Sequence, residues 1–331
     1  MSKCSRDRVK GFLHAEGRKM VNEDGETVVL RGWGVGSWMN PEGFMIGGVP
    51  LFAEVGGFND FALPRRFERG RTMETTVREL AGTAYAKEFA KKWYRNYLSE
   101  EDIRLMAEMG YNSVRLPVSA RLFLAEEPEI QGIEEGFAVL EQVLDWCEKY
   151  HIYAILDLHG APGGQSALAC DDGIDNRPHM FTEPESRERA LLIWEEFAKR
   201  YHDRWIIGGY DLLNEPLSGP DCRKFLPELA KFYDDVIPRI RKYDKKHMLT
   251  LEGSVFSMDM EIFDHDYDPE CHNWCIHIHY YGFSPEVRTL YRFLDASLKN
   301  NVPIWIGEGG SDPVSNSIFY EIAGAYDIGY A

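Results

Sequence analysis

The sequence of 331 residues has no apolar run long enough to cross a bilayer, and its first ten residues, Met1 to Lys10, are polar and charged. A transmembrane helix needs about 20 mostly apolar residues, and a secretory signal has an apolar stretch behind its basic start. We therefore expect no membrane partner. The visible sequence predicts a cytoplasmic protein, or a secreted one if a signal has been removed.

Positive charge is also scarce. Lys and Arg total 37 against 54 Asp and Glu, which gives a formal net charge of -17 at pH 7. Proteins that bind nucleic acid or anionic lipid concentrate basic side chains where they meet the phosphates. The charge balance therefore argues against nucleic acid as a partner.

Paired cysteines and repeats are the other absences. The six cysteines are scattered, and only Cys271 and Cys275 lie close together, without a second pair at metal-site spacing. This usage predicts reduced structural thiols. The sequence shows no internal repeat and is 44% hydrophobic, so we expect one domain over residues 1–331 around a single large core.

What the sequence does contain is an alternation of short β-rich runs with amphipathic helical stretches. This is the pattern of βα units with a parallel sheet. The expected strands are 28–36, 113–119, 153–159, 210–215, 248–253, 274–281 and 303–308, and the expected helices are 100–109, 137–150, 185–201, 226–243 and 285–300. The pattern predicts a (β/α)8 TIM barrel in the α/β class.

A closed barrel of this kind has eight strands, and only seven are complete in the pattern. An eighth would begin near Ile328, three residues before the last one. We therefore expect the last βα unit to be missing or to be supplied by another segment. Without it the barrel keeps open edges, which are unfavourable.

Two further segments interrupt the alternation. Short apolar pieces between residues 12 and 30 are separated by Gly17 and by the turn dipeptide Asp24-Gly25, which predicts a β-hairpin that plugs one end of the barrel. The stretch from Asn40 to Tyr97 is too long for an ordinary βα loop. We expect this insertion to build one wall of a cleft above the first strand.

The expected strands end in polar side chains. In a parallel barrel the functional groups lie at the carboxyl ends of the strands. The chemistry-bearing residues at these ends are Arg115, Asp157, His159, Asn214, Glu215, His277, His279, Tyr281 and Glu308. Glu215 and Glu308 are three strands apart, so they lie across the cavity from each other, as the two carboxyls of glycosidic bond cleavage do. The alternative for each Glu is a structural ion pair or a helix cap.

Two other kinds of site are compatible with parts of the sequence. His277 and His279 lie on one face of a strand, which is compatible with a metal site, but the other strand ends carry Asn-Glu-Pro and Gly-Glu-Gly instead of further metal ligands. We expect no metal and treat His277 as an inner-barrel residue. The Gly-rich loop 160–165 lacks the Lys-Ser/Thr ending of a phosphate cradle.

These strand ends and their flanks resemble glycoside hydrolase family 5, in particular its branch of exo-β-1,3-glucanases. The matching segments, in the family's order, are LRGW at 30–33, GSW at 36–38, GYNSVRLP at 110–117, DLHGAPGGQ at 157–165, LNEP at 213–216, HYY at 279–281 and IGE at 306–308. The resemblance spans almost the whole chain. It implies a retaining O-glycosyl hydrolase without a cofactor, acting on β-linked glucan or gluco-oligosaccharide.

The resemblance also implies roles for single residues. Glu215 would be the general acid/base and Glu308 the nucleophile, with carboxyl groups about 5 Å apart. Arg115 and Tyr281 would bind Glu308 and lower its pKa, whereas burial would raise that of Glu215. The expected sugar contacts are Asn214 to the 2-hydroxyl, His159 and His279 in the same subsite, and the stacking candidates Trp33, Trp38, Tyr280 and Tyr281.

The sequence departs from the family at two places. Gly309-Gly310 follow the expected nucleophile where the family usually has an aromatic residue, and the eighth strand that brings a subsite Trp is the one expected to be missing. Substrate preference is thus open among an exo-β-1,3-glucanase, an endo-β-1,4-glucanase, a β-mannanase and a glycolipid glucosidase. A carbohydrate-binding barrel without turnover, or a metal-dependent hydrolase, remains an alternative of another class.

Overall fold

The computed structural model describes residues 8–46, 67–125, 133–281 and 286–331, which fold around a parallel sheet of eight strands. The strands are β3 (Gly32–Gly34), β4 (Ser113–Ser119), β5 (Tyr153–Gly160), β6 (Ile207–Asp211), β7 (Leu249–Glu252), β8 (Trp274–Tyr281), β9 (Ile304–Gly310) and β10 (Gly329–Tyr330). Neighbours in the chain are neighbours in the sheet, all in parallel. The first seven overlap the seven predicted runs, and β4 and β8 have the predicted bounds.

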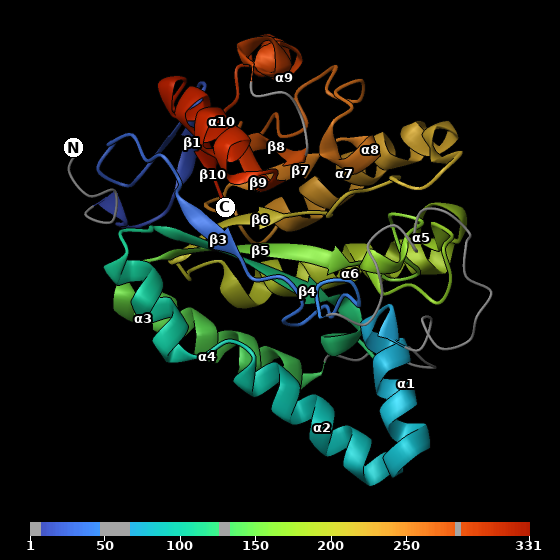
Figure 1. The fold of residues 1–331 in the computed structure, drawn as a ribbon. Coiled ribbons are helices and arrows are strands. Elements are labelled where there is room, and N and C mark those ends of the chain that lie inside the picture. Colours follow the sequence, from blue (N-terminus) through green and yellow to red (C-terminus); the bar gives the residue numbers. More distant parts are fainter. Residues whose placement is uncertain (1–7, 47–66, 126–132, 282–285) are drawn as a thin grey trace.

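The sheet curls until its first and last strands meet beside the carboxyl-terminal end of the chain (Figure 1). The backbone N–H of Tyr330 donates to the carbonyl of Leu30 at 2.8 Å, and Tyr330 pairs in parallel with Arg31 on that side and with Ile306 of β9 on the other. The expectation of an open barrel is therefore wrong at the level of the strands, because the barrel is nearly closed. The eighth strand begins where the sequence predicts it, and its two residues suffice to bridge β9 and the first strand.

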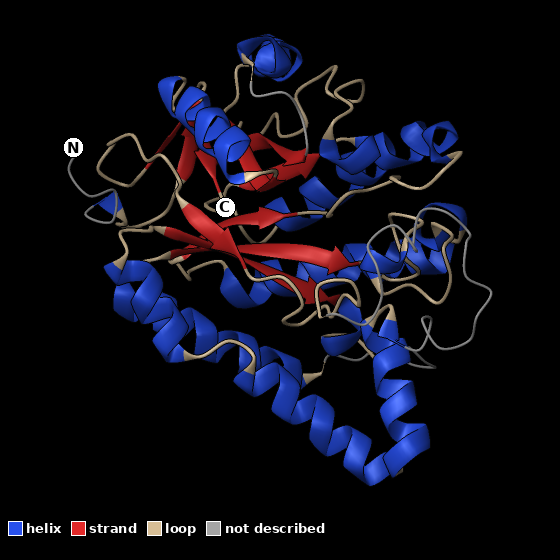
Figure 2. Ribbon diagram, viewed as in Figure 1, coloured by secondary structure: helices blue, strands red, loops and turns tan. Residues whose placement is uncertain are grey.

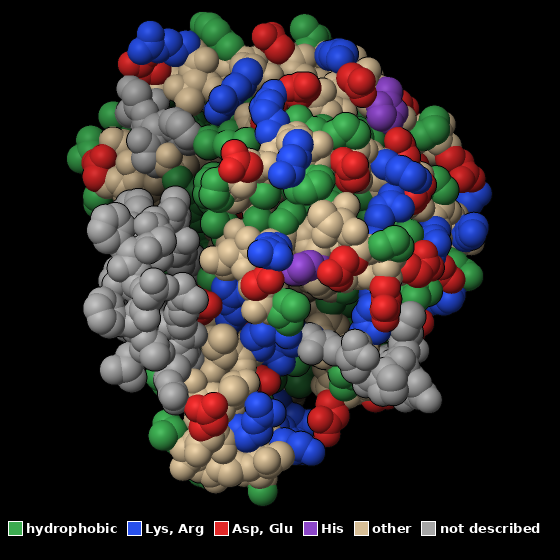
Figure 3. Space-filling model, turned by 90° about the vertical axis from the view of Figure 1, so that its right-hand side faces the viewer, with side chains coloured by type: hydrophobic (Ala, Val, Ile, Leu, Met, Phe, Trp, Pro, Cys, Tyr) green, Lys and Arg blue, Asp and Glu red, His purple; other side chains and the backbone are tan. Residues whose placement is uncertain are grey.

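Helices cover the outside of the barrel (Figure 2). On the face drawn in Figure 3, basic and acidic side chains are interspersed over the surface. The helices are α3 (Glu100–Glu108), α4 (Glu134–Tyr150), α6 (Pro184–Tyr201), α7 (Leu226–Arg241), α9 (Val287–Asn300) and α10 (Pro313–Ala325), with the short α5 (His179–Thr182) and α8 (Ser254–Ser257) in the loops. Helix α4 shows why these segments are helical: Phe137, Leu140, Leu144 and Cys147 recur every three or four residues and are buried. Among the described residues, no helix combines the length and apolarity needed to span a membrane.

The predicted hairpin lies at the amino-terminal end of the barrel. Strands β1 (His14–Glu16) and β2 (Lys19–Val21) pair antiparallel across Gly17, whose φ of 56° is the left-handed conformation that favours glycine. The backbone N–H of Ala15 donates to Asn273, which directly precedes β8, at 2.9 Å. The hairpin thus closes the end of the barrel opposite to the strand ends that carry the polar residues.

The insertion forms an arm of two helices, α1 (Gly70–Ala81) and α2 (Thr83–Asn96), which project from the barrel (Figure 1). The indole of Trp38 donates to the carbonyl of Tyr94 at 2.9 Å and anchors α2. Residues 47–66 of the insertion lie outside the described part. Within that part, the insertion lines the cavity described below through Glu42, Phe44 and Met45.

Candidate active site

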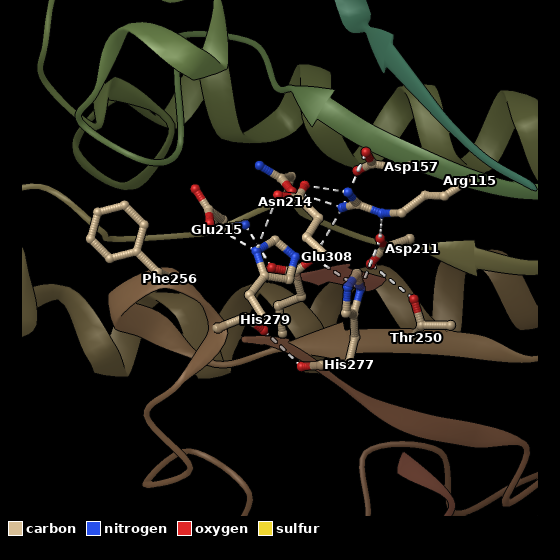
Figure 4. A network of polar contacts seen from close by, with 12 residues as sticks. Arg115, Asp157, Asp211, Asn214, Glu215, Thr250, Phe256, His277, His279 and Glu308 are labelled. Atoms are coloured by element: carbon tan, nitrogen blue, oxygen red, sulfur yellow. Dashed lines mark hydrogen bonds and ion pairs between the residues drawn. The ribbon is translucent and has the colours of Figure 1, made fainter. Parts of the chain in front are cut away.

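The polar strand ends converge at the carboxyl end of the barrel, as the sequence predicts (Figure 4). Arg115 comes from β4, His159 from β5 and His279 from β8. Asn214 and Glu215 follow β6, and Glu308 lies in β9 beside His279. Because all strands run in the same direction, their carboxyl ends place these side chains on one face.

Glu215 and Glu308 face each other across this end of the barrel. One oxygen of each carboxyl group and one ring nitrogen of His279 lie within 4.8 Å of one another. The Nδ1 atom of His279 is 2.8 Å from Oε1 of Glu215 and 3.6 Å from Oε2 of Glu308. Retaining glycosidases hold their two carboxyl groups about 5 Å apart, whereas inverting ones need about 6.5 to 9.5 Å for an interposed water, and oxygens within 4.8 Å fit the closer arrangement.

Glu308 is surrounded by donors and cations. Arg115 Nη1 donates to its Oε1 at 2.5 Å, and the Tyr281 hydroxyl donates to its Oε2 at 2.8 Å. Burial alone would raise the pKa of Glu308, but His279, Arg115 and His159, together with the hydrogen bond from Tyr281, lower it to about 2. The group is therefore an anion at neutral pH, as a nucleophile must be.

Glu215 has the opposite environment. Burial raises its pKa, the hydrogen bond from His279 counteracts this, and the negative charges of Glu308 and Glu252 raise it further. The net direction is upward, which favours the protonated form that a general acid needs. Its backbone has a φ of 44°, a left-handed conformation that is unfavourable for a residue with a side chain.

Asn214 and His159 are joined in one hydrogen-bonded chain. Asn214 Oδ1 accepts from Arg115 Nη2 at 2.7 Å, and its Nδ2 lies 3.3 Å from His159 Nε2. His159 Nδ1 lies 2.7 Å from Asp157 Oδ2. This chain orients the amide of Asn214 beside the two carboxyl groups.

A cavity of about 630 Å³ opens on the Glu308 side of the pair. Its wall includes Arg115, His159, Glu42 and Tyr281, together with four glycines, Gly34, Gly36, Gly307 and Gly309. The volume lies in the range of small-molecule sites in proteins.

The aromatic residues predicted to stack on sugars divide into two groups. Trp33 and Tyr281 are half exposed and line the cavity. Trp38 and Tyr280 do not reach it: Trp38 is fully buried under α2, and Tyr280 stacks on Phe319 of α10 with ring centroids 3.3 Å apart. The prediction of stacking is wrong for these two residues, because an aromatic ring at a strand end also serves the packing of the helix outside it.

The structure also brings in three acidic residues that the sequence reasoning missed. Asp211 and Glu252 are fully buried beneath the pair, and Glu42 reaches within 3.4 Å of His159 Nε2. Glu252 is the last residue of β7, so its position at a strand end was a usable signal. Asp211 also ends its strand, β6, but the predicted strand ran on to residue 215 and hid this signal. Glu42 lies in the insertion and carried no such signal.

The metal alternative rests on Glu252, His277 and His279, whose ligand atoms lie within 4.8 Å of one another. The carboxylate of Glu252 already faces cations of the chain itself: its Oε1 lies 3.3 Å from Arg115 Nη2 and 2.9 Å from His277 Nδ1. A metal ion there would be repelled by the guanidinium, so this donor set fits an ion-pair network better than a metal.

Comparison with known proteins shows the family of the chain. Residues 71–327 match the family model Cellulase (glycosyl hydrolase family 5). The chain belongs to glycosyl hydrolase family 5. A β-xylosidase of Phanerodontia chrysosporium is 31% identical over 82% of this chain and 52% of its own length, and a glucan 1,3-β-glucosidase of Schwanniomyces occidentalis is 27% identical over 68% and 50%.

Among solved structures, that of AoRut superimposes with a TM-score of 0.69 at 17% identity, covering 92% of this chain and 87% of the other. At this identity the likeness concerns the fold, and it supports the TIM barrel of this family 5 member. The chain spans about half the length of the curated relatives described above. The match to the family model therefore establishes the family, and the residues of the site carry the evidence for the activity.

Proposed function

We propose that this family 5 chain is a retaining glycoside hydrolase that cleaves β-glucosidic bonds, with Glu308 as nucleophile and Glu215 as general acid/base. The observation that carries the proposal is the pair of facing carboxyl groups, with oxygens within 4.8 Å and pKa values shifted in opposite directions. Two carboxyl groups this close, one ionised and the other with a raised pKa, suit a double displacement.

In the first step, Glu308 attacks the anomeric carbon while Glu215 gives its proton to the leaving oxygen. A covalent glycosyl ester forms on Glu308 as the glycosidic C–O bond breaks. In the second step, Glu215, now ionised, takes a proton from water, which attacks the same carbon and releases Glu308. Two inversions restore the starting configuration, so the product is the β-anomer.

The neighbouring residues have supporting parts in this scheme. Arg115 and Tyr281 hold the two oxygens of Glu308 so that one lone pair points at the sugar. The amide of Asn214, fixed by Arg115 and His159, is placed to donate to the 2-hydroxyl, a contact that strengthens as positive charge develops on the sugar ring.

The substrate we favour is a β-glucan or β-gluco-oligosaccharide, cleaved as by an exo-β-1,3-glucanase. Support comes from the similarity to a glucan 1,3-β-glucosidase and from a cavity beside Glu308 that is large enough for a sugar. The 31% identity to a β-xylosidase favours a second candidate, a β-xyloside, which differs from a glucoside by lacking the hydroxymethyl group at C5.

The experiment is a set of assays on the purified chain and on Glu308→Gln. The substrates are aryl β-glucoside, aryl β-xyloside, aryl β-mannoside, and β-1,3- and β-1,4-gluco-oligosaccharides, with product anomers followed by NMR. The proposal predicts turnover of a glucoside, with the β-anomer appearing first, and loss of turnover in Glu308→Gln. An α-anomer appearing first would refute retention, and preference for the xyloside would replace glucose as the substrate.

A further inference from the structure

The fully buried Glu252 contacts one member of the carboxyl pair, Glu215, directly, and it contacts the arginine that holds the other. It is the last residue of β7, and it is not part of the cavity wall. Its Oε2 accepts the backbone N–H of Glu215 at 2.7 Å. Its Oε1 lies 3.3 Å from Nη2 of Arg115, the residue whose other nitrogen holds Glu308. The carboxylate of Glu252 thus contacts both the backbone of Glu215 and the guanidinium of Arg115, which binds Glu308.

The contact with Glu215 falls where the backbone needs support. Glu215 has a φ of 44°, and Leu217, two residues on, has a φ of 55°. Conformations of this kind persist only where surrounding contacts determine them. The Ser218 hydroxyl donates to the carbonyl of Glu215 at 2.9 Å, and Glu252 supplies the contact on the amide side. A bond from an N–H to a charged carboxylate is stronger than one between neutral groups.

Glu252 is able to act as a fixed negative charge. Burial by itself would raise its pKa, but the cations of His277 and His279 lower it well below the ordinary range. The charged and titratable groups that face it are Arg115 from β4, Asp211 from β6, His277 and His279 from β8, the Tyr233 hydroxyl from α7, and Glu215 itself. Glu252 is fully buried and does not line the cavity, so its charge acts on the neighbouring residues of the site and is not screened by solvent.

We propose that Glu252 is a positioning residue of the carboxyl pair: it fixes the left-handed backbone of Glu215, and its charge favours the protonated form of that side chain. The inference rests on the proposed role of Glu215. It assigns to Glu252 no contact with the sugar. Glu308 is reached only indirectly, through Arg115, so we expect the larger effect on the proton that Glu215 gives and takes.

Two substitutions separate geometry from charge. Glu252→Gln keeps an oxygen that can accept the Glu215 N–H and removes the charge, whereas Glu252→Ala removes both. The matched control is Asp268→Asn, because Asp268 is also buried and paired with an arginine, Arg241, but lies at the opposite end of the barrel beside Asn273. All three are first checked for folding by circular dichroism, and Glu252→Gln carries the test if the alanine variant does not fold.

The first readout is the dependence of kcat/KM on the leaving group, which a merely structural role does not change. A dinitrophenyl glucoside leaves without a proton, whereas an alkyl glucoside needs the general acid, whose contribution is about 10²- to 10⁴-fold. Glu252→Ala is expected to lose about 10²-fold on the alkyl glucoside and less than about tenfold on the dinitrophenyl glucoside. Equal losses on both substrates would overturn the positioning role.

The second readout needs no substrate. Carbon-13 NMR of labelled glutamate side chains, with Glu215 assigned through Glu215→Gln, gives the pKa of Glu215 directly. Because the charge of Glu252 raises that pKa, Glu252→Gln is expected to lower it, and Asp268→Asn to leave it in place. An unchanged pKa in Glu252→Gln would overturn the charge effect. If the wild type cleaves no glycoside, the proposed function fails, while this titration still decides the inference.

Discussion

The Nδ1 atom of His279 lies 2.8 Å from Oε1 of Glu215 and 3.6 Å from Oε2 of Glu308, so a single imidazole contacts both carboxyl groups. In the sheet, His279 of β8 pairs with Glu308 of β9. The charge of this histidine lowers the pKa of both glutamates. Its removal therefore tests the electrostatics of the pair as a whole.

We expect His279→Ala to move both limbs of the pH profile of kcat/KM to higher pH. The acidic limb follows ionisation of Glu308, and the basic limb follows loss of the proton from Glu215; both pKa values rise when the cation is gone. The measurement is the pH dependence of kcat/KM on an aryl β-glucoside. The control is His272→Ala, a half-exposed histidine paired with Asp266 before β8. If the apparent pKa values of both limbs were the same in His279→Ala as in the wild type, the assigned roles would be disproved.

Tyr281→Phe is expected to reduce activity without unfolding the protein. The variant loses one hydrogen bond to the carboxylate of Glu308, and bonds to charged groups contribute about 1.5–3 kcal/mol, or about 10- to 100-fold in rate. The ring is 49% exposed, so the free energy of unfolding should change by less than about 0.5 kcal/mol. Steady-state kinetics and urea unfolding check both values, and an unaltered kcat/KM would contradict the contact's role.

Arg115→Met is expected to destabilise the fold as well as the site. Arg115 pairs with Asp157, Asp211, Glu252 and Glu308 in the barrel interior. Removing one partner of a buried ion pair costs about 3–5 kcal/mol, because the other charge is left without compensation. This loss of unfolding free energy should become smaller as pH falls through the ordinary pKa range of carboxyl groups, because protonated carboxyl groups need no counter-ion. Urea unfolding at neutral and mildly acidic pH measures this, and a pH-independent loss would argue against it.

Trp38 and Trp33 should respond in opposite ways to replacement by alanine. Trp38 is fully buried, so Trp38→Ala should lower the free energy of unfolding by about 3–5 kcal/mol. The KM of the folded fraction of this variant should stay unchanged. Trp33 is 50% exposed in the cavity wall, so Trp33→Ala should leave stability nearly unchanged and raise KM if the ring stacks on a sugar. Thermal unfolding and KM are measured for both, and a raised KM for Trp38→Ala would restore its predicted stacking role.

The fold and the candidate pair could be predicted because they follow from local patterns. The runs that became β4 and β8 are short β-rich segments between amphipathic stretches. The rule that parallel strands present their carboxyl ends on one face placed Arg115, Glu215, His279 and Glu308 together. Closure by β10 was not predicted, because two residues make no hydrophobic pattern. They pair only once the curvature of the whole sheet brings Leu30 within reach of Tyr330.

The parts of the site that were missed depend on tertiary contacts. Trp38 and Tyr280 follow the same aromatic signal as Trp33 and Tyr281, and only the packing of α2 and α10 decides which rings are buried. The left-handed backbone of Glu215 likewise has no signature in its sequence, because it is not a glycine. The importance of Glu252 becomes visible only when its distance to that backbone is known.

The most direct test of the account is to trap the covalent intermediate. A dinitrophenyl β-glucoside carrying fluorine at C2 forms the glycosyl ester quickly, because its leaving group needs no proton, and releases it slowly, because fluorine destabilises the positive charge at the transition state. We predict that mass spectrometry of the digested protein finds the fluoroglucosyl group on the peptide containing Glu308, and that Glu308→Gln is not labelled. Labelling on Glu215 or on another residue would contradict the assignment, and so would turnover of unfluorinated aryl glucoside by Glu308→Gln.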